Sequence, residues 1–161
     1  MSSLAYRRND TATTDTRASL PTIDTLDELA RFVLNEPDTC VRYSKGPHAD
    51  RGQPSVDCES GLLLPGLSVV ALKPEPWWTR DRRDWIARQL CHYIHLKDGD
   101  DDRMAWLLIG RVAGVGPDRE PLLWPWTPVA SLSAASIEEA RERYEANFDA
   151  GRDSLEWSPG P

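Results

Sequence analysis

The apolar run at residues 105–113, Ala-Trp-Leu-Leu-Ile-Gly-Arg-Val-Ala, most constrains the fold. It is rich in residues that favour strands, and Gly114, Gly116 and Pro117 end it, so it predicts a core β-strand. Residues 117–120 then predict a turn, and the apolar and aromatic residues from 122 to 129 predict a return strand. Three prolines, Pro121, Pro125 and Pro128, favour a sheet edge for that strand. The sequence therefore predicts a β-hairpin.

Two further strands are predicted upstream. Residues 40–43 are short and rich in strand formers, and residues 61–72 are apolar except at Ser68, as expected of a strand buried on both sides. Between them, residues 45–60 hold several Gly, Pro and charged residues and predict a loop.

Capping signals place three helices. Thr25 to Glu28 and Ser136 to Glu139 match the capping box, which predicts helices over residues 26–35 and from 136 to about 148. Thr79 is expected to cap a third helix over residues 80–95. The order of elements predicts an α+β fold, with a small mixed or mostly antiparallel sheet of about four strands and about three helices.

Length and composition set the organisation. The 161 residues fit one globular domain, expected at residues 21–150. Residues 1–20 are polar and aperiodic and predict a disordered arm, while residues 151–161 predict a flexible tail.

The charge and the apolar content exclude several classes of function. A net charge of −7 argues against general nucleic-acid binding, which needs clustered Lys and Arg. There is no apolar run long enough for a membrane span and no signal core, so we expect a cytoplasmic protein. The three cysteines do not form a disulfide pattern, and none has the surroundings of a nucleophile.

Arg42 is the first candidate functional residue, because a lone Arg in an apolar strand needs a partner. Either a carboxylate of the protein, such as Asp57 or Glu59, satisfies it, or an anionic ligand does. We predict that Arg42, Tyr43 and Ser68 line a small cleft, with Ser68 on a neighbouring strand.

His92 and His95 raise a metal hypothesis, because two imidazoles three residues apart on a helix can share an ion. The spacing fixes no third ligand. We interpret one histidine as lying at the helix end and the other on the surface, and we predict no metal site.

Five sequence blocks resemble an actinomycete family of unknown function. They begin at Val41, Glu59, Pro74, Trp85 and Gly114 and read VRYSKGP, ESGLLLPGLSV, PEPWWTR, WIARQLC and GVGPDREP. The resemblance covers residues 40–153 and implies no established activity.

The order of Arg42, Ser68 and Glu120 more faintly resembles ADP-ribosyltransferases. That resemblance implies that NAD is the cofactor, that Arg42 binds its pyrophosphate and that Ser68 supports the nicotinamide pocket. It also implies that the catalytic Glu120 stabilises a cationic transition state.

Two Trp pairs suggest a different kind of function. Trp77 and Trp78, and likewise Trp124 and Trp126, could form a groove for a ligand or a partner protein, because Trp is frequent at binding hot spots. The other interpretation is that these indoles pack in the core under the proline-rich connections, since large apolar patches are uncommon on the surface of a monomer. The alternative to an enzyme is therefore an adaptor or immunity-type interaction module, with Trp77 and Trp78 among its binding residues.

Overall fold

The computed structural model describes residues 20–92, 94 and 102–149. The expected arm, most of whose residues lie before Leu20, and the tail at residues 151–161 fall outside the described residues.

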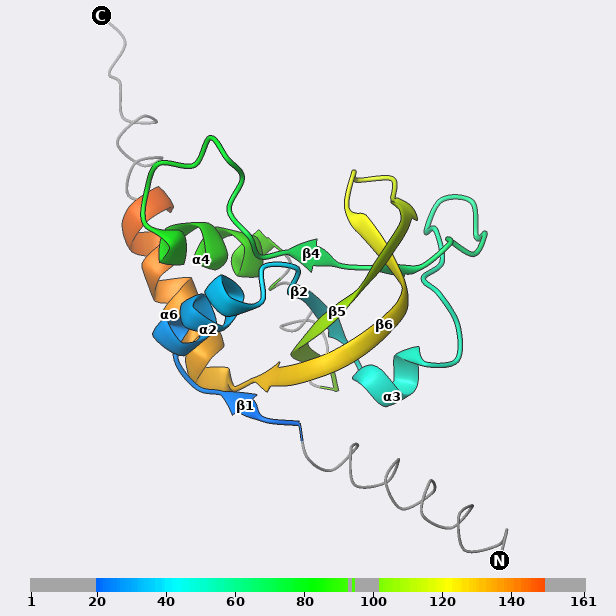
Figure 1. Cartoon of the computed structure of the whole chain (residues 1–161), viewed down its shortest axis with the longest axis horizontal. Helices are drawn as coiled ribbons and strands as arrows, with labels where there is room; N and C mark the ends of the chain where they lie inside the picture. The colour runs from blue at the N-terminus through cyan, green and yellow to red at the C-terminus, as the bar shows by residue number, and fades with distance from the viewer. Residues whose placement is uncertain (1–19, 93, 95–101, 150–161) are drawn as a thin grey trace, which may run out of the picture.

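A mixed sheet forms the centre of the structure (Figure 1). Its strands are β1 (Thr22–Ile23), β2 (Cys40–Ser44), β3 (Leu67–Ser68), β4 (Val70–Ala71), β5 (Met104–Val115) and β6 (Pro121–Leu132). The strand order is β1-β6-β5-β2-β4. Strand β3 also pairs with β6, at a different position along it from β1. Only the β1–β6 pairing is parallel among the described strands.

Four α-helices accompany these six strands in the described residues: α2 (Leu26–Asn35), α3 (Pro47–Asp50), α4 (Arg82–His92) and α6 (Ala134–Tyr144). A π-helical turn at Glu145–Asp149 follows α6. The α+β prediction is confirmed, with somewhat more strands and helices than expected.

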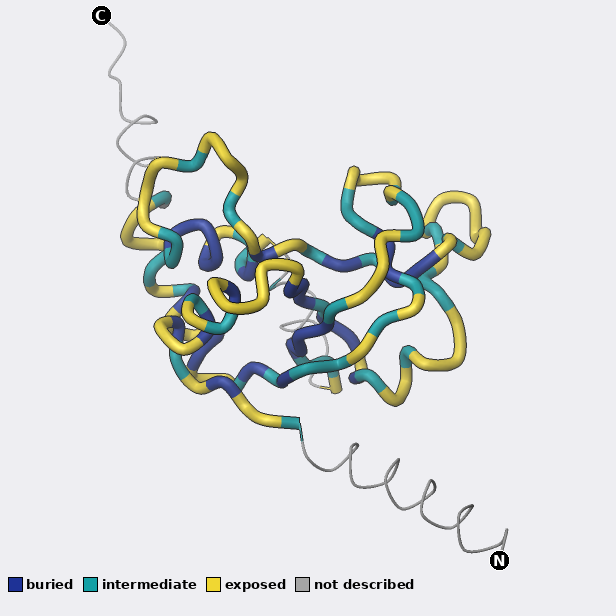
Figure 2. Tube along the Cα trace, viewed as in Figure 1, coloured by how far each residue is buried: buried dark blue, intermediate teal, exposed yellow. Residues whose placement is uncertain are grey.

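Two apolar clusters occupy the two faces of the sheet. Helices α2, α4 and α6 gather at one end in Figure 1 and pack with Val41, Tyr43 and Leu107 in the larger cluster. Because side chains alternate along a strand, Cys40, Trp106 and Leu108 lie on the opposite face, in the smaller cluster. Figure 2 shows the hairpin tip and the loop after α3 largely exposed.

The helix starts differ from the sequence prediction at two places. Asp81, and not Thr79, caps α4, since its carboxylate accepts a hydrogen bond from the Arg83 amide at 2.8 Å. Ser133, and not Ser136, caps α6 through a 3.2 Å bond from the Ser136 amide. In each case the side-chain oxygen of a nearby residue, two positions after Thr79 and three before Ser136, accepts from the free amides instead. The predicted cap Thr25 is confirmed by the bond from the Glu28 amide at 3.1 Å.

The predicted strand at residues 61–72 is broken into two short strands. Residues 67–68 pair with β6 and residues 70–71 pair with β2, so the chain passes from one strand partner to another at Val69. Leu62 and Leu63 upstream are exposed. Gly61 has a φ of +72°, and Pro65 lacks an amide proton, which is incompatible with one continuous ladder.

Candidate functional site

The guanidinium of Arg42 is held inside the protein. Its Nε donates to the Asp50 carboxylate at 2.7 Å, and its Nη1 donates to the Ser68 carbonyl oxygen at 2.7 Å. The two charged side chains are 18% and 14% exposed. Arg42 therefore has a protein carboxylate as its partner, although that carboxylate is Asp50 and not Asp57 or Glu59.

Asp50 also connects Arg42 to the core. The Ser44 hydroxyl donates to the Asp50 carboxylate at 2.5 Å and accepts from the indole N–H of the buried Trp106 at 3.0 Å. The Gly46 amide donates to the same hydroxyl at 3.1 Å. These bonds fix the short helix α3 against β2 and β5, and Asp50 is its last residue.

Glu120 belongs to the hairpin turn. One carboxylate oxygen accepts from the Ser68 hydroxyl at 2.9 Å, and the other accepts from the Asp118 amide at 2.9 Å. Arg119 beside it has a φ of +64°, and a Cβ on Gly116 would overlap the Glu120 carboxylate. The Gly-Pro-Asp-Arg-Glu block thus has a structural role, which is to close this turn.

Three of the sequence-predicted site residues, Arg42, Ser68 and Glu120, form a chain of contacts. Arg42 contacts the Ser68 backbone, and the Ser68 hydroxyl contacts Glu120. The Tyr43 hydroxyl is buried and donates to the Leu90 carbonyl oxygen at 3.0 Å. Glu120 lines a polar cleft of about 270 Å³ between α4, β4 and the hairpin turn, together with Arg88, Gln89, His92 and Arg119. Arg42, Tyr43 and Ser68 are not among its lining residues.

Trp77 and Trp78 form an aromatic cluster with the buried Trp85. The three rings make edge-to-face contacts with centroids 5.1 to 6.1 Å apart, and Trp77 is 64% exposed. Arg80 lies over Trp78, and Arg88 lies over Trp85. The three indoles therefore pack against one another, with the exposed Trp77 ring at the edge of the cluster.

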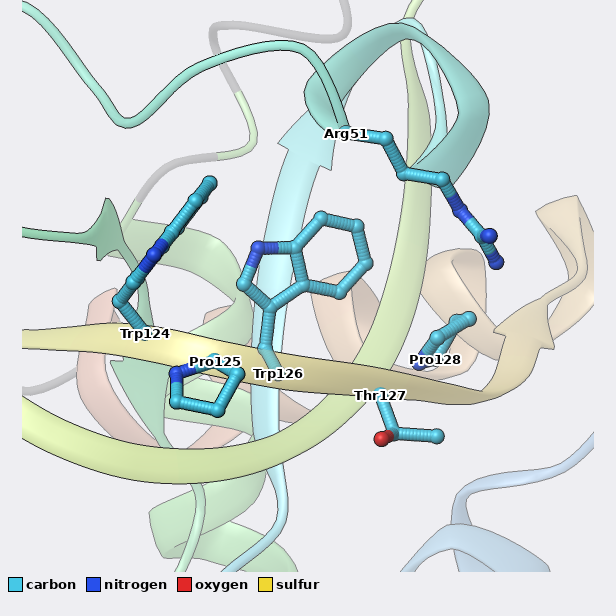
Figure 3. A pocket seen from close by; sticks show the side chains of 6 residues that line it. All are labelled: Arg51, Trp124, Pro125, Trp126, Thr127 and Pro128. Atoms are coloured by element: carbon cyan, nitrogen blue, oxygen red, sulfur yellow. The ribbon is translucent and has the colours of Figure 1, made fainter.

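A second aromatic surface, which we term the Trp groove, is a hollow of about 390 Å³ over β6. Its lining residues are Arg51, Trp124, Pro125, Trp126, Thr127 and Pro128. Figure 3 shows Trp124, Trp126 and Pro128 on one side of the strand, with Arg51 reaching from the end of α3 toward Pro128. Trp126 is anchored from below, because its ring contacts the buried Trp106 at a centroid distance of 5.3 Å.

The position of Arg51 follows from the ion pair described above. Arg51 is the residue directly after Asp50, so the bonds that hold Asp50 to Arg42 and Ser44 also hold the base of the Arg51 side chain. Arg51 itself is exposed, and its guanidinium makes no ion pair with any described residue. The Trp groove thus combines two half-buried indoles with one unpaired cation.

A model of DUF6098, a family of unknown function, matches residues 16–156. The chain belongs to this family. The match spans all the described helices and strands, and it confirms the resemblance to a family of unknown function. No curated protein and no solved structure matches the chain, so the resemblance to ADP-ribosyltransferases stays a prediction.

No metal centre is found in the described part of this family member. No three His, Cys, Asp or Glu side chains converge there on a point that could hold an ion, and His95 lies outside the described residues. Burial, with a smaller effect of Asp38, raises the pKa of the Cys40 thiol to about 12.

The described helices also fall short of the length and apolarity needed to cross a bilayer.

Sequence reasoning identified Trp124 and Trp126 as a candidate cluster but missed Asp50 and Arg51. The missed residues lie in the segment predicted as a loop. One signal was present, because Pro47 after Gly46 is typical of the first position of a helix, and that helix is α3.

Proposed function

We propose that this chain is a non-enzymatic protein-interaction module that binds an extended peptide segment of a partner in the Trp groove. The observation that carries the proposal is the pairing of two half-buried indoles with Arg51, a cation without an ion-pair partner in the described residues. Trp and Arg are the residues most enriched at binding hot spots, where large ring surfaces are buried at a small cost in side-chain entropy.

The rigidity of the Trp groove supports the proposal. Trp126 rests on Trp106, and the Trp106 N–H is bonded to Ser44, which is bonded to Asp50. A site that is ordered before binding loses less entropy when the ligand arrives. The Trp groove is therefore already ordered and can bind a ligand without first rearranging.

NAD-dependent glycosyl transfer by Arg42, Ser68 and Glu120 stays a prediction, and the geometry favours it less. The Arg42 guanidinium would have to leave Asp50 to bind a pyrophosphate. Both Glu120 oxygens would have to leave the turn or share their bonds to stabilise a developing cation. Each exchange costs free energy, because it breaks a charge-assisted hydrogen bond.

A selection from a random peptide display library on the full chain tests the proposal. We expect enrichment of peptides that bind the wild type and are lost on a Trp124→Ala variant. Trp77→Ala is the matched control, since it removes an exposed indole outside the Trp groove. Failure to enrich any peptide that depends on Trp124 would contradict the proposal. A parallel incubation with labelled NAD tests the enzymatic prediction, which needs cleavage that Glu120→Gln abolishes.

A further inference from the structure

The Trp groove adjoins a stretch of β6 that has an open edge. On the side away from β5, β3 pairs with β6 at Leu122 and Leu123, and β1 pairs with it at Ser131 and Leu132. No described strand pairs with the edge between these positions. We refer to residues 124–130 as the open edge.

The open edge is poorly suited to the addition of another β-strand. Pro125 and Pro128 have no amide proton to donate. The pairing of β6 with β5 also shifts register here, since Leu107 is opposite Ala130 and Leu108 is opposite Pro128, which leaves Val129 as an extra residue. Prolines and bulges at an exposed edge are features by which proteins prevent strand addition. A ligand at the Trp groove therefore has to be recognised mainly through side chains.

The side chains of the Trp groove present hydrogen-bond donors. The indole N–H groups of Trp124 and Trp126 have no acceptor within the described residues, unlike the N–H of Trp106, which is bonded to Ser44. An indole N–H only donates, so a ligand that displaces water from these rings has to offer a carbonyl oxygen or another acceptor. A polyproline II helix carries its carbonyls outward with no internal hydrogen bonds, and aromatic grooves recognise that conformation.

The positive charge in the lining of the Trp groove favours a negatively charged ligand. Arg51 is the charged residue of its lining, and it reaches toward the Pro128 end of the hollow (Figure 3). A guanidinium binds carboxylates through two parallel N–H bonds. A carboxylate on the ligand is the natural partner of this unpaired cation.

From these observations we infer that the partner segment is an acidic, proline-rich peptide bound in the polyproline II conformation, with a carboxylate on Arg51 and backbone carbonyls on the two indoles. The inference rests on the proposed function and narrows it to one class of ligand. It excludes an added β-strand as the binding mode.

Titration of the full chain with three synthetic peptides of equal length tests the inference. The first is acidic and proline-rich, the second has Thr and Val in place of Pro, and the third has Lys in place of the acidic residues. We expect the first to bind at least tenfold more tightly than the other two. Arg51→Glu should weaken binding of the first peptide at least tenfold and strengthen binding of the third, a charge reversal that loss of folding could not produce.

Other outcomes separate the inference from the proposed function. Equal or tighter binding of the Thr and Val peptide would overturn the polyproline II inference and leave the interaction module intact. The same holds if display-selected peptides bind through Trp124 while the acidic proline-rich peptide does not. Failure of every peptide, selected ones included, would overturn both. A dimer of the full chain that Trp124→Ala dissociates would assign the Trp groove to a second copy and also overturn the inference.

Discussion

The Asp50 carboxylate accepts a hydrogen bond from Arg42 at 2.7 Å, and this pair fixes the helix end from which Arg51 extends over the Trp groove. Arg42 is a residue on which the sequence alone suggests ligand binding. In the structure its charge is used to hold another element in place. Arg51, nine residues further along the chain, makes no ion pair with any described residue.

Asp50→Asn should destabilise the protein, because the largely buried guanidinium of Arg42 then lacks a negative partner. We expect the free energy of unfolding in urea to fall by about 2 to 3 kcal/mol, slightly less than the roughly 3–5 kcal/mol of fully buried pairs. Asp27→Asn is the matched control. It breaks the exposed pair with Arg83 and should cost less than about 1 kcal/mol. Equal losses in the two variants would contradict this account.

Gly110→Ala should also destabilise the protein, because a Cβ there would lie 2.6 Å from the Pro125 carbonyl oxygen on β6. Backbone atoms cannot move aside as a flexible side chain can, so we expect a loss of about 1–3 kcal/mol. The contact would also displace the backbone of β6 at Pro125 and Trp126, two residues that line the Trp groove. At Gly52 a Cβ would meet no atom within 4 Å, so Gly52→Ala should leave the thermal midpoint nearly unchanged. A stable Gly110→Ala variant would show that β5 and β6 can separate here.

The cap of α4 should give a measurable acid dependence of stability. Hydrogen bonds from the Arg83 side chain and amide lower the pKa of Asp81 from its ordinary value of 3.8. A lowered pKa in the folded state means that the contribution is present above that ordinary value and is lost as the pH falls below it. Asp81→Ala should cost about 1 kcal/mol at pH 7.

Unfolding free energies at a series of pH values test this dependence. The gap between wild type and Asp81→Ala should narrow steadily as the pH falls below about 4, because the Asp81 carboxylate of the unfolded chain takes up a proton there while that of the folded chain stays ionised. A gap that stays constant over that range would mean that the charge of Asp81 contributes nothing to the cap.

The cysteines should differ in their rates of alkylation. Burial raises the pKa of Cys40 to about 12, so its thiol stays protonated and shielded at pH 8, whereas Cys58 is exposed. With iodoacetamide, mass spectrometry should find Cys58 modified well before Cys40. In urea the two rates should become similar. Rapid modification of Cys40 in the native state would indicate that β2 opens readily.

The elements that short-range patterns specify could be predicted from the sequence. Helix α2 and the β5–β6 hairpin follow from apolar spacing, from the Thr25 cap and from the glycines and proline of the turn. The fragmentation of residues 61–72 could not be predicted, because it depends on which strands lie nearby. Val69 separates a pair with β6 from a pair with β2, and that choice of neighbours is made by tertiary structure.

The candidate site could be predicted only in part, for the same reason. The two Trp residues of β6 are visible as a motif, but the position of the Trp126 ring depends on its contact with Trp106, which comes from another strand. Arg51 gives no signal in the sequence, because its place over the Trp groove depends on a contact between Asp50 and a residue on another element. Glu120 has a pattern that suggests catalysis, yet its carboxylate closes a turn.

Calorimetric titration of a display-selected peptide into the wild type, Trp124→Ala and Trp77→Ala tests the central claim most directly. The account predicts that Trp124→Ala weakens binding at least tenfold, about 1.4 kcal/mol or more, while Trp77→Ala binds as the wild type does. Unchanged affinity in Trp124→Ala, or a loss confined to Trp77→Ala, would contradict the assignment of the Trp groove as the binding site.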